Sequence, residues 1–372
     1  MGVVDTVTRV QVGEKGLPLS KEEKDRYSRQ IVLRDFGVEG QLKVKSARVC
    51  VVGVGGLGSA SSLQLAGIGV GYLRIIDRDV VDLTNLQRQL IYNVSSIGYP
   101  KVEVAAKKLN DLNPGIKVDP VATNIGEDNA ESLVKGVDVV VDALDRFGPR
   151  FAVNRACVKL GIPYVFGGAI ETYGNATTII PGETPCLECL FHNADDSEVP
   201  TCERVGVIPP IINIIASIQV NETIQLILKE KPSLANKIIY CDLKSMSFDV
   251  FNVAKREDCS VCGKSEIPSQ KAVTEPTRTG EKEGSVSELC GEESFMVTPK
   301  QQVSINTLEA GKILAKKYKV RIVASYGVTL NVSDKISVSL MKGGNMLIKG
   351  TESTDKAQQI YNDIMKLIET TD

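Results

Sequence analysis

A glycine-rich segment after an apolar run is the first place where the sequence points to chemistry. Gly53, Gly55 and Gly58 have the spacing G-x-G-x-x-G, which lets the backbone close around a phosphate at the N-terminus of a helix. Asp77 ends the next apolar run, about 20 residues beyond the glycines, where an acidic residue binds ribose hydroxyls. The motif predicts a nucleotide site, but it leaves open whether a nicotinamide or flavin enzyme or another nucleotide user carries it.

Charged residues further along favour a triphosphate. Arg88 and Lys101 follow Asp77 in the chain, and two cations beside a glycine loop suit a triphosphate better than a nicotinamide. Asp145 comes just past an expected strand at 137–143, at a carboxyl end, where a carboxylate can hold Mg²⁺. The sequence contains no G-x-x-x-x-G-K-[S/T], so a P-loop is excluded. Taken singly, the cations could equally be solvated charges, and Asp145 a helix cap.

Four of the nine cysteines form two Cys-x-x-Cys pairs, Cys186/Cys189 and Cys259/Cys262. This spacing is typical of a structural four-thiolate zinc site, and the long gap means that the pairs would meet only through the tertiary fold. The first residues contain no apolar signal region, so we expect a cytoplasmic, reducing location where such pairs bind metal more often than they form disulfides. His192 is an alternative ligand, but we interpret it as a polar surface residue.

Cys202 is the candidate nucleophile. It stands in the segment Thr-Cys-Glu-Arg-Val-Gly-Val, on a polar loop ahead of an expected helix. A helix N-terminus and the nearby Arg204 both favour the thiolate, which is the reactive form. The alternative is an incidental loop cysteine. Cys290 is the second candidate because its polar surroundings leave it exposed.

An α/β architecture is expected to position these residues. Apolar runs predict strands that alternate with helical patterns, which is typical of a doubly wound, Rossmann-like and mostly parallel sheet. The expected strands are 49–52, 72–76, 117–122, 137–143, 163–169, 176–180, 237–242 and 247–253. A very apolar stretch at 208–228 carries Asn213, Gln219 and Glu222, so we interpret it as a buried helix and not as a membrane span.

Length and composition predict a soluble chain of about two domains. The 372 residues are 42% hydrophobic and 24% charged, with a net charge of -2, which gives no sign of a nucleic-acid-binding surface. We expect a flexible N-terminus at 1–19, the nucleotide and zinc domain at 20–263 and a linker of polar composition at 264–294. A small α+β domain at 295–372 is predicted from a strand, a Gly-Gly hairpin turn and an amphipathic helix.

Several motifs occur together in one order over about residues 20–263. They are Arg-Tyr-Ser-Arg-Gln, Gly-x-Gly-Gly-Leu-Gly, Ile-Asp-x-Asp, Asn-Leu-x-Arg-Gln, Gly-x-Pro-Lys and the two Cys-x-x-Cys pairs. In this combination the chain resembles the ubiquitin-activating-enzyme-like family that includes MoeB, ThiF and HesA. The resemblance implies ATP- and Mg²⁺-dependent adenylation of the C-terminal glycine carboxylate of a ubiquitin-like protein, a structural zinc ion, and attack by Cys202 to form a thioester.

The resemblance also implies roles for single residues. Gly56 would back the nucleotide, Asp77 would bind the ribose, and Asp145 would carry Mg²⁺. The phosphates would be lined by Asp79, Asn85, Arg88 and Lys101. The counterpart of Arg29 reaches into the ATP site of a partner subunit, which implies a homodimer. One departure concerns the position after the magnesium aspartate, where the family usually has Asn and this chain has Arg146.

The preferred function is activation of a ubiquitin-like modifier, with residues 295–372 tethered to recruit a conjugating enzyme. This segment contains no cysteine, so it cannot be a working rhodanese-type sulfurtransferase. The main alternative is adenylation of a ubiquitin-like sulfur carrier for molybdopterin, thiamine or tRNA thiolation. Two other classes are an NAD-dependent oxidoreductase and a non-catalytic scaffold that binds carriers. Neither a nucleic acid nor a membrane is an expected partner.

Overall fold

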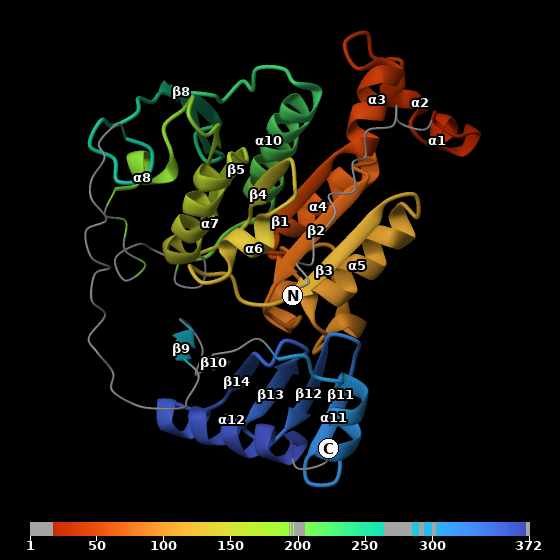
Figure 1. Ribbon diagram of the computed structural model, residues 1–372, viewed down its shortest axis with the longest axis vertical. Coiled ribbons are helices and arrows are strands. Elements are labelled where there is room, and N and C mark those ends of the chain that lie inside the picture. Colours follow the sequence, from red (N-terminus) through yellow and green to blue (C-terminus); the bar gives the residue numbers. More distant parts are fainter. Residues whose placement is uncertain are drawn as a thin grey trace, which may run out of the picture.

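In the computed structural model, residues 18–192, 194, 196, 205–263, 285–289, 294–299 and 303–369 are described. They form two sheets, one above the other in Figure 1. The first sheet has eight strands in the order β3-β2-β1-β4-β5-β6-β7-β8. Its strands are β1 (Arg48–Val52), β2 (Tyr72–Asp77), β3 (Lys117–Ala122), β4 (Val139–Asp142), β5 (Tyr164–Ile170), β6 (Tyr173–Ile179), β7 (Lys237–Asp242) and β8 (Ser247–Asn252).

Strands β3, β2, β1, β4 and β5 pair in parallel, and β6, β7 and β8 extend the sheet in antiparallel fashion. The central strands β1 and β4 are nearly continuous apolar runs because both of their faces are covered. Val49 and Val51 contribute to one buried cluster, whereas Cys50 and Val52 contribute to the other. This arrangement confirms the predicted doubly wound Rossmann-like sheet.

Helices cover both faces of this sheet (Figure 1). Helices α4 (Gly56–Ile68), α5 (Lys101–Leu112) and α10 (Pro209–Leu228) supply apolar side chains to the cluster that contains Val49. Helices α6 (Ala130–Val134) and α7 (Phe147–Leu160) supply the opposite cluster. By length and composition α10 could cross a membrane, but half of it is buried, and it packs against α4, β5 and β6 as the expected core helix.

The chain enters the first domain through three short helices, α1 (Lys21–Arg26), α2 (Ser28–Ile31) and α3 (Gly37–Ser46). Ser20 caps α1 in a capping box with Glu23, as the sequence indicates. Figure 1 places the three helices at the end of the sheet that is far from the second sheet. Residues at this end therefore lie away from the carboxyl ends of β1 and β2.

The second sheet has six strands in the order β11-β12-β13-β14-β10-β9, and its pairings are antiparallel. Its elements are β9 (Ser285–Leu289), β10 (Ser294–Thr298), α11 (Thr307–Leu314), β11 (Lys319–Val323), β12 (Gly327–Asn331), β13 (Ser337–Met341), β14 (Met346–Lys349) and α12 (Thr354–Glu369). Strand β9 falls within the expected linker at 264–294 and pairs with β10 at the edge of this sheet. Its polar composition is that of a strand at the edge of the sheet.

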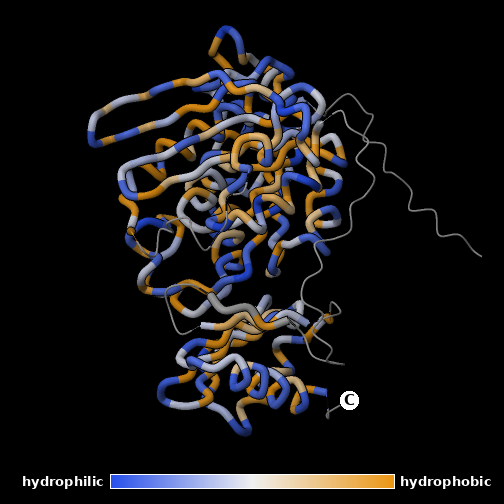
Figure 2. Tube along the Cα trace, turned by 90° about the vertical axis from the view of Figure 1, so that its left-hand side faces the viewer, coloured by the Kyte–Doolittle hydropathy of each residue, from blue (hydrophilic) through white to orange (hydrophobic). Residues whose placement is uncertain are grey.

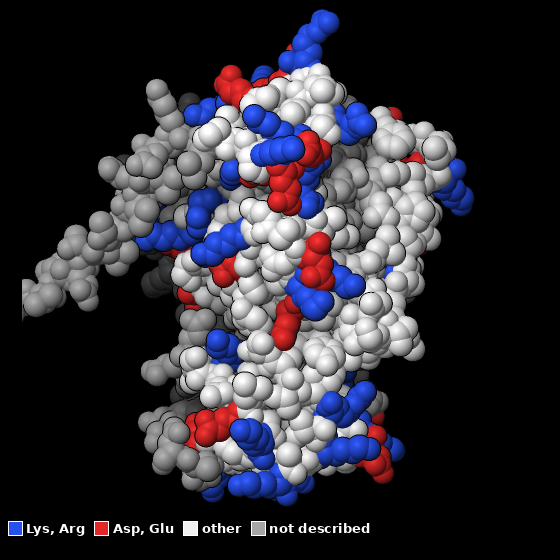
Figure 3. All heavy atoms as spheres, turned by 90° about the vertical axis from the view of Figure 1, so that its right-hand side faces the viewer, with Lys and Arg blue, Asp and Glu red and all other residues white. Residues whose placement is uncertain are grey.

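The two helices of this part lie on the side of its sheet that faces away from the first domain (Figures 1 and 2). In Figure 2 apolar residues gather in the sheet layer directly beneath the first domain, while the helices alternate between polar and apolar residues. On the face drawn in Figure 3, positive and negative side chains are interspersed without a continuous basic surface.

Candidate nucleotide site and cysteine cluster

The glycine turn lies at the point where the chain reverses its direction of travel across the first sheet. After β1 the strands proceed to β2 and β3, and β4 then returns to the other side of β1. Ligands of such sheets bind at the carboxyl ends of the strands on either side of this point. Helix α4 begins here at Gly56, so the N-terminus of a long buried helix faces the predicted nucleotide site.

Two of the glycines are required by close packing. Gly53 has a φ of +89°, and a Cβ at this position would lie 2.5 Å from the carbonyl oxygen of Ala143. A Cβ at Gly58 would lie 1.9 Å from the carbonyl oxygen of Gly53. A Cβ at Gly55 would have no neighbour closer than 3.8 Å, and one at Gly56 would lie 3.0 Å from Ile212. The first and third motif glycines thus fix the turn, while Gly55 leaves room beside it.

Asp77 ties the glycine turn to the loop after β2. One of its carboxylate oxygens accepts a hydrogen bond from the backbone N–H of Val54 at 2.7 Å, and the other accepts from Asp79 at 2.7 Å. Burial raises the pKa of Asp77, against the nearby Lys101 charge, and the Asp79 carboxylate raises it further. A carboxylate held in this position has lone pairs left to accept ribose hydroxyls.

Lys101 and Asp79 form an ion pair beside this turn. Lys101 is the first residue of α5 and is 5% exposed, and its Nζ lies 3.0 Å from Oδ2 of Asp79. Burial raises the pKa of Asp79, but the charges of Lys101 and Arg78 outweigh it and lower the pKa to about 2. Burial lowers the pKa of Lys101, while the carboxylates of Asp79, Asp77 and Asp145 raise it overall. The pair therefore stays ionised at neutral pH.

Asn85 and Arg88 belong to the loop that joins β2 to α5. Asn85 is buried, and its side-chain oxygen accepts from the backbone N–H of Asp82 at 3.0 Å. The guanidinium of Arg88 donates to the carbonyl oxygen of Thr84 at 2.9 Å. In this structure Asn85 shapes the loop, and Arg88 is held by the backbone of the same loop.

Asp145 is exposed in the segment between β4 and α7, and Arg146 is the residue that precedes α7. The charge of Asp145 acts on Lys101, so the structure brings the two strand-end loops together. An exposed carboxylate facing a phosphate site suits Mg²⁺, which binds through one or two carboxylates plus substrate phosphates. The position of Asp145 therefore fits the role that the resemblance implies.

A buried ion pair near Asp145 was not predicted from the sequence. Arg150 is 7% exposed, and its Nε lies 3.2 Å from Oδ2 of the fully buried Asp142. The same guanidinium donates to the carbonyl oxygens of Leu144 and Gly167, the latter at 2.8 Å, and packs on the ring of Phe166 at 4.8 Å. It thereby fixes the strand end that leads to Asp145. The sequence did carry a signal: Arg150 lies three residues before Val153 and seven before Cys157, which places it on the apolar face of the expected helix.

Arg29 lies on α2 and is exposed. Its neighbour Gln30 donates to the carbonyl oxygen of Ile68, the last residue of α4, at 2.9 Å. Because α4 has thirteen residues, its two ends are about 20 Å apart. The structure therefore places Arg29 far from the glycine turn of its own chain.

Cys202 and Cys290 lie outside the described residues. The segment just after Cys202 is described, and it joins the turn between β5 and β6. Glu171 donates its backbone N–H to the carbonyl oxygen of Gly206 at 2.8 Å, and Ile208 donates to that of Glu171 at 3.0 Å. The described neighbours therefore anchor the start of α10 near the end of β5.

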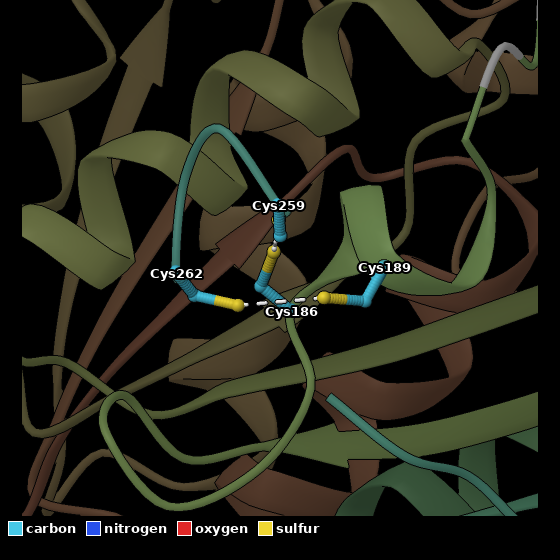
Figure 4. Close-up of side chains that lie close together, drawn as sticks. All are labelled: Cys186, Cys189, Cys259 and Cys262. Atoms are coloured by element: carbon cyan, nitrogen blue, oxygen red, sulfur yellow. Dashed lines mark hydrogen bonds between the residues drawn. The ribbon is translucent and has the colours of Figure 1, made fainter. Parts of the chain in front are cut away.

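The two Cys-x-x-Cys pairs meet in space, as Figure 4 shows. All four Sγ atoms lie within 4.8 Å of one another. Cys186 and Cys259 are 3.6 Å apart, and Cys189 and Cys262 are 3.4 Å apart, which is too long for disulfides. Four thiolates around Zn²⁺ at about 2.3 Å lie about 3.8 Å from one another, so the cluster fits a zinc ion. His192 is exposed and is not part of it.

Cys186 precedes the short helix α8 (Leu187–Leu190) and Cys189 lies within it. The other pair lies in a turn after β8. The backbone N–H of Arg256 points to the sulfur of Cys189 at 3.5 Å. The cluster borders the apolar core beneath α7, next to Phe191, and not the glycine turn. A metal here would join two distant chain segments, which is a structural role.

A sequence model described as the ThiF family matches residues 27–261. A SAMP-activating enzyme E1 of Haloferax volcanii is 39% identical over 254 residues, which cover 68% of this chain and 94% of that protein. A sulfur carrier protein ThiS adenylyltransferase of Bacillus subtilis is 30% identical over 350 residues, which cover 91% of this chain and 98% of that protein. The crystal structure of E. coli MccB with ATP matches with a TM-score of 0.57 and 29% identity, covering 64% of this chain and 74% of that one.

Proposed function

Because the chain belongs to the ThiF family and is an adenylyltransferase like its relatives, we propose that it adenylates a ubiquitin-like sulfur carrier with ATP. The name of the Bacillus subtilis relative, which matches 91% of this chain, supports a sulfur carrier over the modifier-conjugation pathway that the sequence favoured. The ion pair between the buried Lys101 and the partly exposed Asp79 carries the proposal, because it fixes a cation beside the glycine turn, where the phosphates of ATP would lie.

In the proposed reaction an oxygen of the carrier's C-terminal carboxylate attacks the α-phosphorus of ATP. A carboxylate–phosphorus bond forms, the bond to the β-phosphate oxygen breaks, and pyrophosphate leaves. The N-terminus of α4 and the glycine turn bind phosphate oxygens through backbone N–H groups. Lys101 and Arg88 neutralise the charge on the transferring phosphate and on pyrophosphate without reorganising. Mg²⁺ held at Asp145 would supply further neutralisation of the phosphate charge.

Carrier-dependent exchange of labelled pyrophosphate into ATP tests this proposal. Lys101→Ala and Asp145→Ala are expected to lower the exchange rate about 100-fold or more, since each removes a preorganised charge. Lys107→Ala is the matched control, because Lys107 lies on the same helix with its side chain 77% exposed. Exchange near the wild-type rate in both site variants would refute the assignment. A wild-type protein that shows no pyrophosphate exchange with any ubiquitin-like carrier would refute the function.

We propose that Cys202 accepts the activated carrier. Its thiolate would attack the acyl carbon of the adenylate, forming a C–S bond while AMP leaves with the oxygen of the broken acyl–phosphate bond. Cys202→Ala should retain pyrophosphate exchange, because adenylation precedes this step, but should lose the thiol-sensitive adduct seen on non-reducing gels. An adduct that persists in Cys202→Ala would move the acceptor elsewhere, with Cys290 the first candidate.

We also propose a cytoplasmic homodimer in which each subunit lends Arg29 to the ATP site of its partner. The exposure of Arg29 supports this, as does its place beside Gln30, which contacts the end of α4 that lies about 20 Å from the glycine turn of the same chain. Mixing Arg29→Ala with Lys101→Ala protein tests it. Subunit exchange should restore part of the exchange activity, because one of the two sites in the mixed dimer is then intact. A mixture no more active than its components would count against the shared site.

A further inference from the structure

The second sheet is covered on both of its faces. Along β10, β13 and β14 every second residue points to the helices α11 and α12, and the residues between them point to the first domain. Met296, Met341 and Leu347 are at most 3% exposed and share one buried apolar cluster with Val80 and Val81 of the first domain. A module tethered by a flexible linker would leave this face open to solvent, so the second domain is docked.

The second domain contacts the segment that carries two residues of the nucleotide site, Asp79 and Lys101. Residues 79–82 and 98–101 run side by side as a ribbon, defined here by three backbone hydrogen bonds. Val81 donates to Tyr99 at 2.9 Å, Gly98 donates to Val81 at 2.8 Å, and Lys101 donates to Asp79 at 2.9 Å. Asp79 and Lys101, which form the ion pair of the site, are therefore both part of this ribbon.

Polar contacts from the second domain reach both sides of the ribbon. Nζ of Lys349 on β14 lies 3.1 Å from Oδ2 of Asp82. The hydroxyl of Thr329 on β12 donates to the carbonyl oxygen of Gly98 at 2.8 Å in a buried position. A Cβ at Gly98, where φ is +89°, would lie 2.6 Å from the side chain of Ile322. The positive φ favours glycine here, and the Ile322 side chain of the second domain lies directly against Gly98.

The first turn of α5 is held in the same way. The carboxylate of Glu103, two residues after Lys101, accepts the backbone N–H groups of Ser325 at 3.0 Å and Tyr326 at 2.9 Å. These two donors lie in the turn between β11 and β12. A carboxylate that accepts two backbone N–H groups forms charge-assisted bonds, which are stronger than neutral ones.

We propose that the C-terminal domain is a positioning element of the adenylation site, in which Lys349 and Glu103 hold the ribbon that carries Asp79 and Lys101. The proposal rests on the proposed function and extends it to residues that touch neither ATP nor the carrier. Catalysis by fixed charges requires the charges to be in place before the reaction, and a displacement of about 1 Å is costly. The C-terminal domain supplies that rigidity by docking against the ribbon.

Point variants of the full chain test the proposal, because deletion of the domain would expose its apolar cluster. Amide hydrogen exchange over residues 79–101 is measured without ATP, and KM and kcat for ATP are measured in the pyrophosphate exchange assay. Glu103→Ala should speed hydrogen exchange and raise KM for ATP about tenfold or more, since two charge-assisted bonds are lost. Lys349→Ala should change both about threefold, because the ion pair is partly exposed.

Controls separate positioning from general stability. Lys349→Arg should restore hydrogen exchange and KM, because it keeps the charge. Lys312→Ala, at an exposed position on α11 beyond the sheet, should change neither. Amide hydrogen exchange over 79–101 that is unchanged in both Glu103→Ala and Lys349→Ala would overturn the proposal. Faster amide hydrogen exchange in these variants without a rise in KM for ATP would also overturn it. A wild-type protein without pyrophosphate exchange would refute the function, while altered hydrogen exchange in the variants would still establish the coupling.

Discussion

Replacing Arg150 by alanine is expected to be one of the most destabilising single changes in the nucleotide domain. Its guanidinium is the charge partner of Asp142, which is fully buried. Removing one partner of a buried ion pair costs roughly 3–5 kcal/mol, because the other charge is left without compensation. At about 2–4 °C per kcal/mol for a domain of this size, the melting temperature should fall by about 10 °C.

The pH dependence gives the mechanism a second check. Burial raises the pKa of Asp142, and Arg150 lowers it in part, so the pKa should rise further in Arg150→Ala. When the folded-state pKa of a carboxyl exceeds its unfolded value of about 3.9, the protein loses stability as the pH rises from the unfolded to the folded pKa. The difference in unfolding free energy between Arg150→Ala and wild type should therefore be larger at pH 7 than at pH 5.

Arg155→Ala is the matched control, because Arg155 lies on the same helix and also forms two ion pairs, with Glu127 and Glu188. Its side chain is 44% exposed, so the loss should be no more than about 1 kcal/mol. Urea unfolding and thermal melts followed by circular dichroism measure both variants. A loss below about 1 kcal/mol in Arg150→Ala, or equal losses in the two variants, would refute the reasoning.

Three further predictions concern the metal, the glycine turn and the ion pair. Elemental analysis should find about one zinc per chain, and Cys259→Ser should lose both the metal and thermal stability; folded protein without zinc would contradict this. Gly58→Ala should abolish ATP binding in a calorimetric titration, because its Cβ would meet backbone at 1.9 Å, whereas Gly67→Ala on the same helix has open space and should gain about 0.5–1 kcal/mol. Equal effects of the two glycine changes would rule out the packing account. For Asp79, the pKa of about 2 lies below the unfolded value of about 3.9, so the stability advantage of wild type over Asp79→Asn should shrink as the pH falls from about 4 to 2. An advantage that grows in this range would be inconsistent with an ionised pair.

The sequence alone was sufficient for most of the first domain. The central strands β1 and β4 are covered on both faces, so their apolar runs are nearly continuous. The bounds of the parallel strands differ little from those expected. The glycine spacing located the turn because φ at Gly53 and the contact at Gly58 allow no side chain. The φ of Gly53 and the approach of Gly58 to Gly53 are local features, since they involve only residues of the turn itself.

The two long-range features differ in how far the sequence could reach. The Cys-x-x-Cys spacing indicated a metal site, but only the fold brings Cys186 next to Cys259 across 73 positions. Arg150 looked like an ordinary residue of an amphipathic helix, because its partner Asp142 comes from a strand and the pairing depends on how α7 packs. Burial of a charge is a tertiary property, and the sequence carries only its pattern.

The docking of the second domain was decided by tertiary structure alone. Alternation along β13 predicts that its strand has two faces, yet Ser339 and Thr329 look like residues of a solvent-facing side and are 5% exposed at the interface. A period of two records that side chains alternate, but it does not record what covers each face. The partners of Lys349 and Glu103 lie more than 200 residues away in the chain, so their contacts exist only after both domains have folded against each other.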